Sequence, residues 1–363
     1  MRKFIRIYLV PGAVFQSILV GGGYGTGREV IEYFTRLGPY GGLLAILVAF
    51  SIFALVLSLT FEIGRRFQAY DYRAFFQVLL GRGWFLYEIV GFLMLMLSFA
   101  VLIAAASGVL ADGFALPRWI GIVLVFSIIG VLEFFGREAV MRVLTFWSLV
   151  LYAVFITFLV KVYGAIPEDI ASAFESASYG EGWAKSGFLY AMYNMTAAPI
   201  ILYVARDFET SRQSICSGII GAVIAILPAI IFHVAFAGAG DSIASEEIPV
   251  YAMMKAYGMG GLMIAFTIML FGTLIETGAG VLQGVNERID HQLADFGKTQ
   301  LNKWGHTGVA MGFMGISYGV AQIGIVDLIA KGYGTMAWGF FAVYFIPLMT
   351  VGVWNLLKQR PAP

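Results

Sequence analysis

The sequence predicts an all-α, polytopic membrane protein with ten transmembrane helices. Of its 363 residues, 60% are hydrophobic and only 12% are charged, whereas soluble domains have about 25% charged residues. The mean hydropathy is +0.85. Apolar runs such as Leu43 to Leu59 approach the roughly 20 residues that a helix needs to cross a bilayer, and they lack the period of two that a transmembrane barrel requires.

The same composition excludes several classes of function. The single Cys216 rules out an internal disulfide and a cysteine-based metal cluster. A net charge of +1 and three histidines provide no basic surface for nucleic acid and few ligands for zinc. We therefore expect neither a soluble enzyme nor a nucleic-acid partner. The expected contacts are membrane lipid and a small molecule, and the sequence does not indicate an oligomeric state.

Ten apolar runs between charged clusters are the expected spans. In chain order they are 7–34, 40–61, 85–110, 118–135, 141–163, 186–205, 214–236, 258–286, 306–325 and 335–356. The first run follows Arg2, Lys3 and Arg6, but no small-residue cleavage site comes after it, so we expect a span rather than a signal peptide. The whole chain, 1–363, is expected to form one membrane domain.

Basic residues predict that both termini are cytoplasmic, because Lys and Arg are retained on that side of the membrane. With the N-terminus inside, sixteen of the 23 basic residues fall in cytoplasmic segments: Arg2, Lys3, Arg6, Arg65, Arg66, Arg73, Arg82, Arg137, Arg142, Arg206, Arg212, Arg288, Lys298, Lys303, Lys358 and Arg360. The two longest outer connections, 164–182 and 238–258, are acidic.

The first span contains an interruption. Residues 21–27 read Gly-Gly-Gly-Tyr-Gly-Thr-Gly, and each glycine costs a helix about 1 kcal/mol relative to Ala. Thr26 and Glu29 have the spacing of a capping box, which predicts a new helix after the break. Unwound backbone at membrane depth lines a cavity, where free amides suit a carboxylate and carbonyls suit a cation. The alternative is that the glycines only allow close helix packing.

The sixth span has a second interruption at Tyr-Asn-Met-Thr-Ala-Ala-Pro, residues 193–199. Pro199 lacks a backbone donor, and Asn194 or Thr196 can cap a following helix. A simple proline kink is the alternative for this segment.

The two interruptions occupy matching places in the two halves of the chain. Spans 1 and 6, 2 and 7, and 3 and 8 start 179, 174 and 173 residues apart. Five spans separate each pair, so 7–163 and 186–356 are expected to be inverted repeats. Broken helices at corresponding positions of such repeats indicate a substrate site near the bilayer midplane. The expected site residues are Gly22, Gly23, Tyr24, Gly25, Thr26, Gly27, Tyr193, Asn194, Thr196 and Ala197.

These features resemble a known superfamily. The two breaks, the ten spans and the segment Ala205-Arg206-Asp207-Phe208-Glu209-Thr210-Ser211-Arg212 are similar to the amino acid-polyamine-organocation superfamily, with its leucine-transporter-type inverted-repeat fold. Residues 23–29 and Glu62-Ile63-Gly64-Arg65 resemble the YkvI-type bacterial membrane proteins, which are described as amino acid permeases. The resemblance covers nearly the whole chain and implies a bacterial inner-membrane location.

The resemblance also implies a cation site between the first break and span 8. In sodium-coupled members of this fold, the ion lies between these elements, which correspond here to Gly22 and to Thr273, Glu276 and Thr277. The last three residues share one helical face. Glu276 departs from the sodium-dependent pattern, because relatives carry a neutral hydroxyl there. Its carboxylate can neutralise a sodium ion or carry the coupling proton, or it can simply hold span 8 to span 1.

Other candidates have weaker support. Relatives of this fold place an outer-gate arginine after the break, which indicates a gating or carboxylate-binding role for Arg28. Glu62 can act in the pathway or pair with the nearby Arg65 and Arg66. His233 is expected to be a satisfied interior histidine.

Two further features adjoin these candidates. The tyrosines beside the breaks, Tyr24, Tyr190 and Tyr193, can wall a pocket. The amphipathic segment 248–257 can form an outer lid or an interfacial helix.

The leading functional hypothesis is a secondary active transporter for a small amino acid or related zwitterion, coupled to H+ or Na+. A membrane nutrient sensor that uses the same ligand site without transport is the alternative. An intramembrane enzyme is not expected, because Glu276 has no convincing catalytic partner in the sequence.

Overall fold

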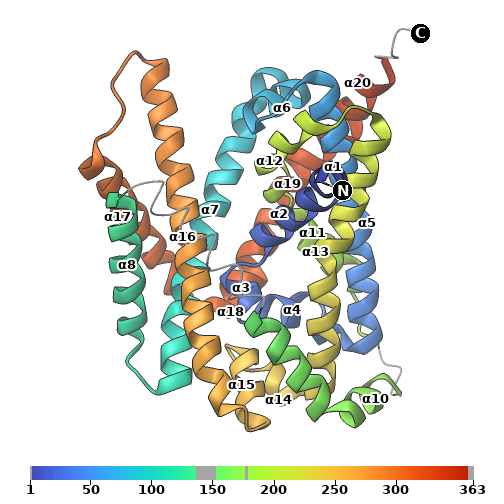
Figure 1. Ribbon diagram of the computed structural model, residues 1–363, viewed down its shortest axis with the longest axis vertical. Helices are drawn as coiled ribbons and strands as arrows, with labels where there is room; N and C mark the ends of the chain where they lie inside the picture. The colour runs from blue at the N-terminus through green and yellow to red at the C-terminus, as the bar shows by residue number, and fades with distance from the viewer. Residues whose placement is uncertain (1, 136–152, 176–178, 359–363) are drawn as a thin grey trace.

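The protein is a helical bundle with both of its ends on one side. The computed structural model describes residues 2–135, 153–175 and 179–358, and the regular elements within them are all helical. In Figure 1 the first and last described helices, α1 (Arg2–Phe4) and α20 (Val353–Lys358), lie in the half of the bundle that carries α6 (Tyr72–Leu80). We call this side the terminal end. The opposite side, the loop end, carries α10 (Pro167–Glu175), α14 (Asp241–Ala244) and α15 (Pro249–Ala256).

Six helical stretches of the described chain are long and apolar enough to cross a membrane. They are Arg28–Phe67, Tyr72–Phe114, Arg118–Phe135, Ser211–Ala239, Gly260–Asp290 and Ile325–Lys358, and Ile5–Leu19 and Ala153–Ala165 are shorter apolar helices. A multi-pass membrane protein is thereby supported, whereas ten spans in two repeats of five remain a prediction. Residues 141–152 of the expected fifth span, with Arg137 and Arg142, lie outside the described residues.

One group of helices packs through small residues. It consists of α2 (Val10–Leu19), α5 (Gly38–Phe67), α11 (Trp183–Asn194) and α13 (Ser211–Ala239), and α5 and α13 share the most extensive contact. A Cβ at Gly218 of α13 would overlap the backbone of Ser58 in α5, and one at Gly187 of α11 would overlap the carbonyl of Ala45. Glycine is therefore needed at both crossings, because only a bare backbone allows this approach.

A second group consists of α7 (Phe85–Phe114), α8 (Arg118–Phe135), α16 (Gly260–Asp295) and α17 (Lys303–Ala321), and these four pack against one another. Figure 1 shows α8, α16 and α17 standing beside α7, away from α5 and α13. The one-turn helix α3 (Gly22–Gly25) touches both α7 and α16. The glycine-rich break therefore lies where the two groups meet.

The surface of the bundle is apolar, as a lipid-facing surface requires. Large exposed side chains include Leu47, Val160, Ile264 and Trp354. Helix α5 has 30 residues, which corresponds to about 45 Å and exceeds the hydrocarbon thickness of a bilayer. It ends at Phe67, after Arg65 and Arg66 at its terminal end, and the capping residue Gln68 has a left-handed φ of +52°.

Candidate functional site

The first helix is interrupted where the glycines predict it. Helix α2 ends at Leu19, and Val20 leaves helical geometry with ψ of 72°. The single turn of α3 follows, and α4 (Arg28–Tyr33) begins only after Gly27, whose φ is +84°. Only glycine adopts that left-handed conformation readily. A Cβ at Gly27 would also overlap the ring of Phe236, so close packing adds a second reason for glycine.

The expected capping box does not form. The Thr26 hydroxyl donates to the carbonyl of Gly23 at 2.8 Å and accepts only a long bond, 3.4 Å, from the amide of Arg28. Helix α4 has Gly27 as its N-cap and no side-chain cap. The physical reason is that the left-handed Gly27 redirects the chain between Thr26 and Glu29, and the Glu29 carboxyl finds a stronger donor elsewhere.

The second interruption lies at the end of α11. This helix stops at Asn194, and α12 (Ala197–Ile200) starts after the two intervening residues, Met195 and Thr196. Asn194 donates to the carbonyl of Tyr190 at 3.0 Å, and Thr196 donates to the carbonyl of Tyr193 at 3.0 Å. Both side chains therefore bond backward into α11, and the expected cap on the next helix is absent. The short helix η4 (Leu202–Asp207) continues the segment.

One carboxyl group contacts both interruptions. The hydroxyl of Tyr193, next to the second break, donates to Oε2 of Glu29 at 2.6 Å. The other oxygen, Oε1, lies against Gly23, where a Cβ would overlap it. Glu29 and Tyr193 are both buried. The lack of a side chain at Gly23 thus makes room for a carboxyl that links α4 to α11.

Tyrosines surround this carboxyl. The ring centroid of Tyr193 is 5.3 Å from that of Tyr33, 5.5 Å from that of Tyr190 and 4.7 Å from that of Tyr333. The Tyr33 hydroxyl donates to the carbonyl of Ile329 at 2.9 Å. The hydroxyls of Tyr24 and Tyr190 are fully buried without a hydrogen-bond partner in the described chain. Because buried polar groups are nearly always paired, these two hydroxyls mark an incomplete polar site.

Arg28 holds the loop end closed over the first break. Its guanidinium donates to the carbonyls of Ala244 at 2.9 Å and Glu246 at 3.1 Å, and it pairs with Glu32 at 3.1 Å. The amide of Val250 donates to the carbonyl of Thr26 at 3.3 Å. Arg28 is fully buried, so these bonds join α4 to the segment that precedes α15.

The expected lid segment lies on this site. Five residues of α15 are buried: Pro249, Val250, Tyr251, Met253 and Met254. An interfacial helix would keep only one face against protein, whereas this helix is covered on most sides. The packing therefore favours the lid over the interfacial helix.

Helix α16 brings the expected cation residues to the neighbourhood of the break. Leu270 of α16 lies against Gly25, where a Cβ would be 2.8 Å from its Cδ1. Thr273 is buried and donates to the carbonyl of Met269 at 3.0 Å. Glu276 and Thr277 are half-buried. Among the described residues no group of three His, Cys, Asp or Glu side chains is placed to hold a metal ion.

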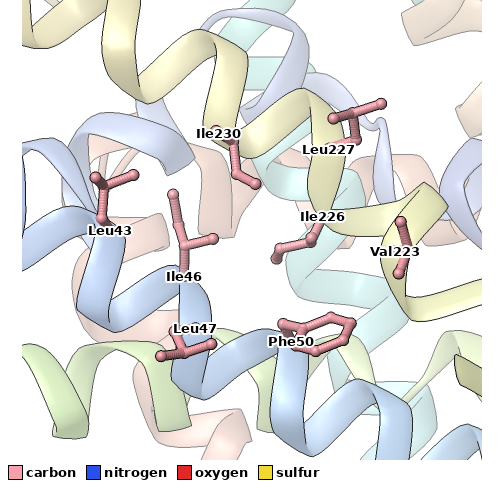
Figure 2. A pocket seen from close by; sticks show the side chains of 8 residues that line it. All are labelled: Leu43, Ile46, Leu47, Phe50, Val223, Ile226, Leu227 and Ile230. Atoms are coloured by element: carbon pink, nitrogen blue, oxygen red, sulfur yellow. The ribbon is translucent and has the colours of Figure 1, made fainter.

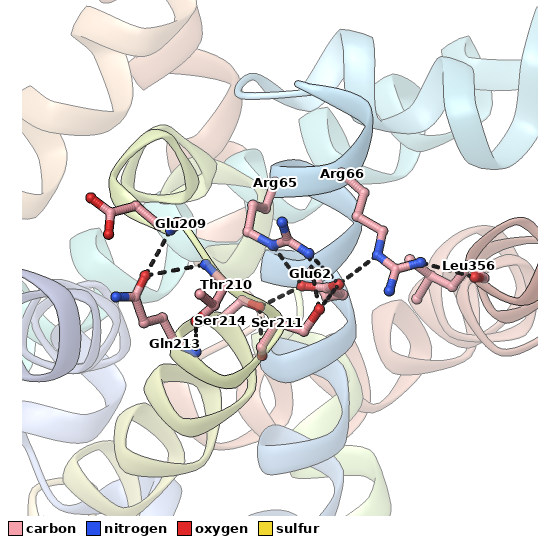
Figure 3. A network of polar contacts seen from close by, with 9 residues as sticks. All are labelled: Glu62, Arg65, Arg66, Glu209, Thr210, Ser211, Gln213, Ser214 and Leu356. Carbon is pink, nitrogen blue, oxygen red and sulfur yellow. Dashed lines mark hydrogen bonds and ion pairs between the residues drawn. The ribbon is translucent and has the colours of Figure 1, made fainter. Parts of the chain in front are cut away.

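Glu62 forms structural ion pairs with Arg65 and Arg66 near the end of α5. Figure 3 shows its carboxylate accepting from Arg65, Arg66, Ser211 and Ser214, with distances of 2.6 to 2.9 Å. These contacts tie the terminal end of α5 to the start of α13. Pairing with the neighbouring arginines is thus the interpretation of Glu62 that the geometry supports.

His233 is also satisfied. Its Nε2 is 2.8 Å from the carbonyl of Pro39, and its Nδ1 is 3.1 Å from the hydroxyl of Thr35. Both ring nitrogens therefore have partners, as expected for an interior histidine.

An apolar cavity of about 310 Å³ lies between α5 and α13 (Figure 2). Its lining side chains are Leu43, Ile46, Leu47, Phe50, Val223, Ile226, Leu227 and Ile230. Leu47 and Leu227 are exposed on the bundle surface. A cavity without polar side chains cannot pair the charges of a zwitterion, so it is not the substrate site.

The sequence matches no family model and no curated protein. Its structure resembles a Na+-coupled sialic acid symporter in a substrate-bound outward-open state, with a TM-score of 0.59 and 13% identity over 94% of this chain and 78% of that chain. It also resembles the Eremococcus coleocola manganese transporter in complex with an aromatic bis-isothiourea compound, with a TM-score of 0.56 and 12% identity over 96% and 79% of the two chains. The chain has a transporter fold.

The symporter is described as Na+-coupled. At these identities the likeness identifies the fold.

The tyrosine-ringed carboxyl is the feature that sequence reasoning missed. Glu29 was expected to cap a helix and to be one of the functional charges just beyond the break, whereas Tyr33 and Tyr333 were not candidates. Tyr24, Tyr190 and Tyr193 were expected to wall a pocket, and they do lie around Glu29. A signal was present: a carboxylate directly after a glycine break at membrane depth is costly unless it has a function.

Proposed function

We propose that this protein is a secondary active transporter that moves a small amino acid or related zwitterion by alternating access, coupled to H+ or Na+. The observation that carries the proposal is the meeting of the two interrupted helices, joined by Tyr193 and Glu29. Broken helices that face each other inside a membrane bundle supply backbone polar groups to a small polar substrate. The likeness to transporters supports the same conclusion.

In this proposal the substrate lies against the backbone of 22–27 and 194–198. Tyr24 and Tyr193 form its aromatic walls, and the small residues Gly23, Gly25 and Ala197 allow the substrate to approach the main chain. Backbone recognition suits the ammonium and carboxylate groups that all amino acids share. We propose the amino acid-polyamine-organocation superfamily, and within it the YkvI-type proteins, as the family.

Arg28 is the proposed outer gate. Its bonds to the carbonyls of Ala244 and Glu246 close the loop end, so opening toward that side requires their release. The proposed orientation puts both termini in the cytoplasm of a bacterial cell, with the loop end outside. Gly22, Thr273, Glu276 and Thr277 are the proposed sites of the coupling ion, with Na+ at the three α16 residues.

Uptake into proteoliposomes tests the function. The purified protein is reconstituted, and accumulation of a labelled amino acid mixture is measured under an imposed proton gradient and, separately, a sodium gradient. The proposal expects accumulation under at least one gradient. Thermal stabilisation by an amino acid without any flux would instead identify a membrane sensor.

A further inference from the structure

We propose that Glu29 is a proton-binding site of this transporter and that protonation of its carboxyl regulates the contact between the two interrupted helices. The inference rests on the proposed function and adds a proton site separate from the coupling-ion residues proposed on α16.

The carboxyl is buried with one donor. Tyr193 donates to Oε2, and no hydrogen bond to Oε1 or ion pair to Glu29 links it with any other described side chain. Burying a charged carboxylate costs much free energy unless a cation pairs with it or a proton neutralises it. Oε1 is packed against Gly23, which leaves little room for a larger cation. A proton needs no such space.

Among the described residues, no basic side chain forms an ion pair with Glu29. The phenols of Tyr24, Tyr33, Tyr190, Tyr193 and Tyr333 interact electrostatically with it, from α3, α4, α11 and the segment η5 (Leu328–Tyr333). All five are neutral phenols. Basic side chains of α4 and of two elements packed against it have other partners. Arg28 pairs with Glu32 and the loop carbonyls, Lys331 of η5 pairs with Asp327, and His233 of α13 contacts Thr35 and Pro39.

The surroundings of the carboxyl favour a bound proton over a bare charge. A proton on Oε1 converts the carboxylate to a neutral carboxylic acid, and Tyr193 continues to donate to Oε2. The phenols of Tyr24 and Tyr190 interact electrostatically with Glu29 and are buried without a hydrogen-bond partner in the described chain. Protonation therefore removes a buried negative charge that only one hydrogen bond offsets.

The position of Glu29 explains how the proton can be coupled to substrate movement. Its carboxyl lies against Gly23 in the first break, and Tyr193 immediately precedes the second. The bond from Tyr193 is charge-assisted when Glu29 is ionised and weaker when it is neutral. Taking up one proton thus loosens the link between α4 and α11, and releasing that proton restores it.

Infrared difference spectroscopy with the proton itself as the ligand tests the inference. Wild-type protein in lipid is titrated, and the carbonyl-stretch band of a protonated carboxyl is followed. We expect one pH-dependent band to be lost in Glu29→Gln and retained in Glu276→Gln. A spectrum of Glu29→Gln that titrates like wild type, or loss of the band in Glu276→Gln alone, overturns the proposal.

Tyr193→Phe provides a second variant if Glu29→Gln does not fold. It retains the carboxyl but removes its donor, so the Glu29 band is expected to change frequency. An unchanged band overturns the proposal. Because the titration needs no substrate, a wild-type protein that titrates at Glu29 but transports no amino acid disproves the transporter function and leaves the proton site standing.

Discussion

Tyr193 and Glu29 lie 164 residues apart in the chain and share a buried hydrogen bond of 2.6 Å. Tyr193 is the second-last residue of α11 before the interruption, and Glu29 is the second residue of α4 after the other interruption. This bond joins the two broken helices directly. The surrounding tyrosines and the closed loop end complete the site around it.

Replacing Tyr193 with Phe should destabilise the protein by about 1 to 2 kcal/mol, because it leaves the buried Oε2 of Glu29 without a donor. The variant should also transport more slowly. Thermal unfolding in detergent and uptake in proteoliposomes measure the two effects. Tyr163→Phe is the matched control, since its hydroxyl donates to the carbonyl of Ile231 at 2.8 Å away from the breaks. Equal transport by both variants would contradict the role of the Tyr193 bond.

Gly23→Ala should abolish transport while the protein still folds. The added methyl would overlap Oε1 of Glu29 and lie 3.0 Å from Cδ1 of Ile329, so the carboxyl has to move away from the break. Gly21→Ala is the control, because nothing lies within 4 Å of a Cβ at Gly21. Wild-type uptake by Gly23→Ala would show that the carboxyl has no fixed place in the mechanism.

Arg28→Gln should open the loop end. The change removes an ion pair and weakens two bonds to loop carbonyls, and a loss of about 1.4 kcal/mol shifts an opening equilibrium tenfold. Val250→Cys in a Cys216→Ala background reports this opening through its labelling rate with a membrane-impermeant maleimide. We expect labelling to become on the order of tenfold faster.

Arg118→Gln is the matched control for the gate. Arg118 pairs with Glu247 of the same loop at 3.0 Å, but both side chains are exposed, so little change in labelling is expected. If both variants accelerated the labelling of Val250→Cys equally, the charge of the loop, rather than the Arg28 contact, would control access to the site from the loop end.

Glu62→Gln should lower stability by about 1 to 3 kcal/mol, because Arg65 and Arg66 lose their charged acceptor. Ligand binding at the breaks should remain, since the cluster in Figure 3 lies at the terminal end. Thermal unfolding without the transported amino acid measures the stability of the variant, and the shift when the amino acid is added measures ligand binding. Loss of ligand binding without loss of stability would make Glu62 a pathway residue.

Glu209→Gln provides a comparison for Glu62. The hydrogen bond and charge of Lys3 hold the pKa of Glu209 below its usual range, and both side chains are exposed. Its stabilising contribution is present above the usual pKa of a glutamate and is lost as the pH falls through the lowered value. At neutral pH the Gln variant should therefore lose much less stability than Glu62→Gln.

Local features of the sequence predict much of this architecture. Five glycines in residues 21–27 disfavour a helix whatever surrounds them, and the structure has the break there. The alternation of apolar runs and charges likewise predicts membrane helices. The capping box was wrong because its rule considers only neighbouring residues, whereas the carboxyl of Glu29 pairs with a tyrosine from a distant helix.

Long-range pairing explains the other omissions. Tyr333 joins the site because η5 packs against α4 and α7, and no spacing in the sequence indicates this contact. The buried bond from Asn286 to Glu133, 2.9 Å long, was missed for the same reason. Which partner a buried polar group selects depends on the packing of helices, and this packing is determined by the whole chain.

Transport under imposed gradients tests the central claim most directly. Proteoliposomes with the wild-type protein, and matched ones with Gly23→Ala, are given a labelled amino acid mixture with a proton gradient or a sodium gradient. The account predicts accumulation by the wild type under at least one gradient and none by Gly23→Ala. No accumulation by folded wild-type protein under either gradient would contradict it.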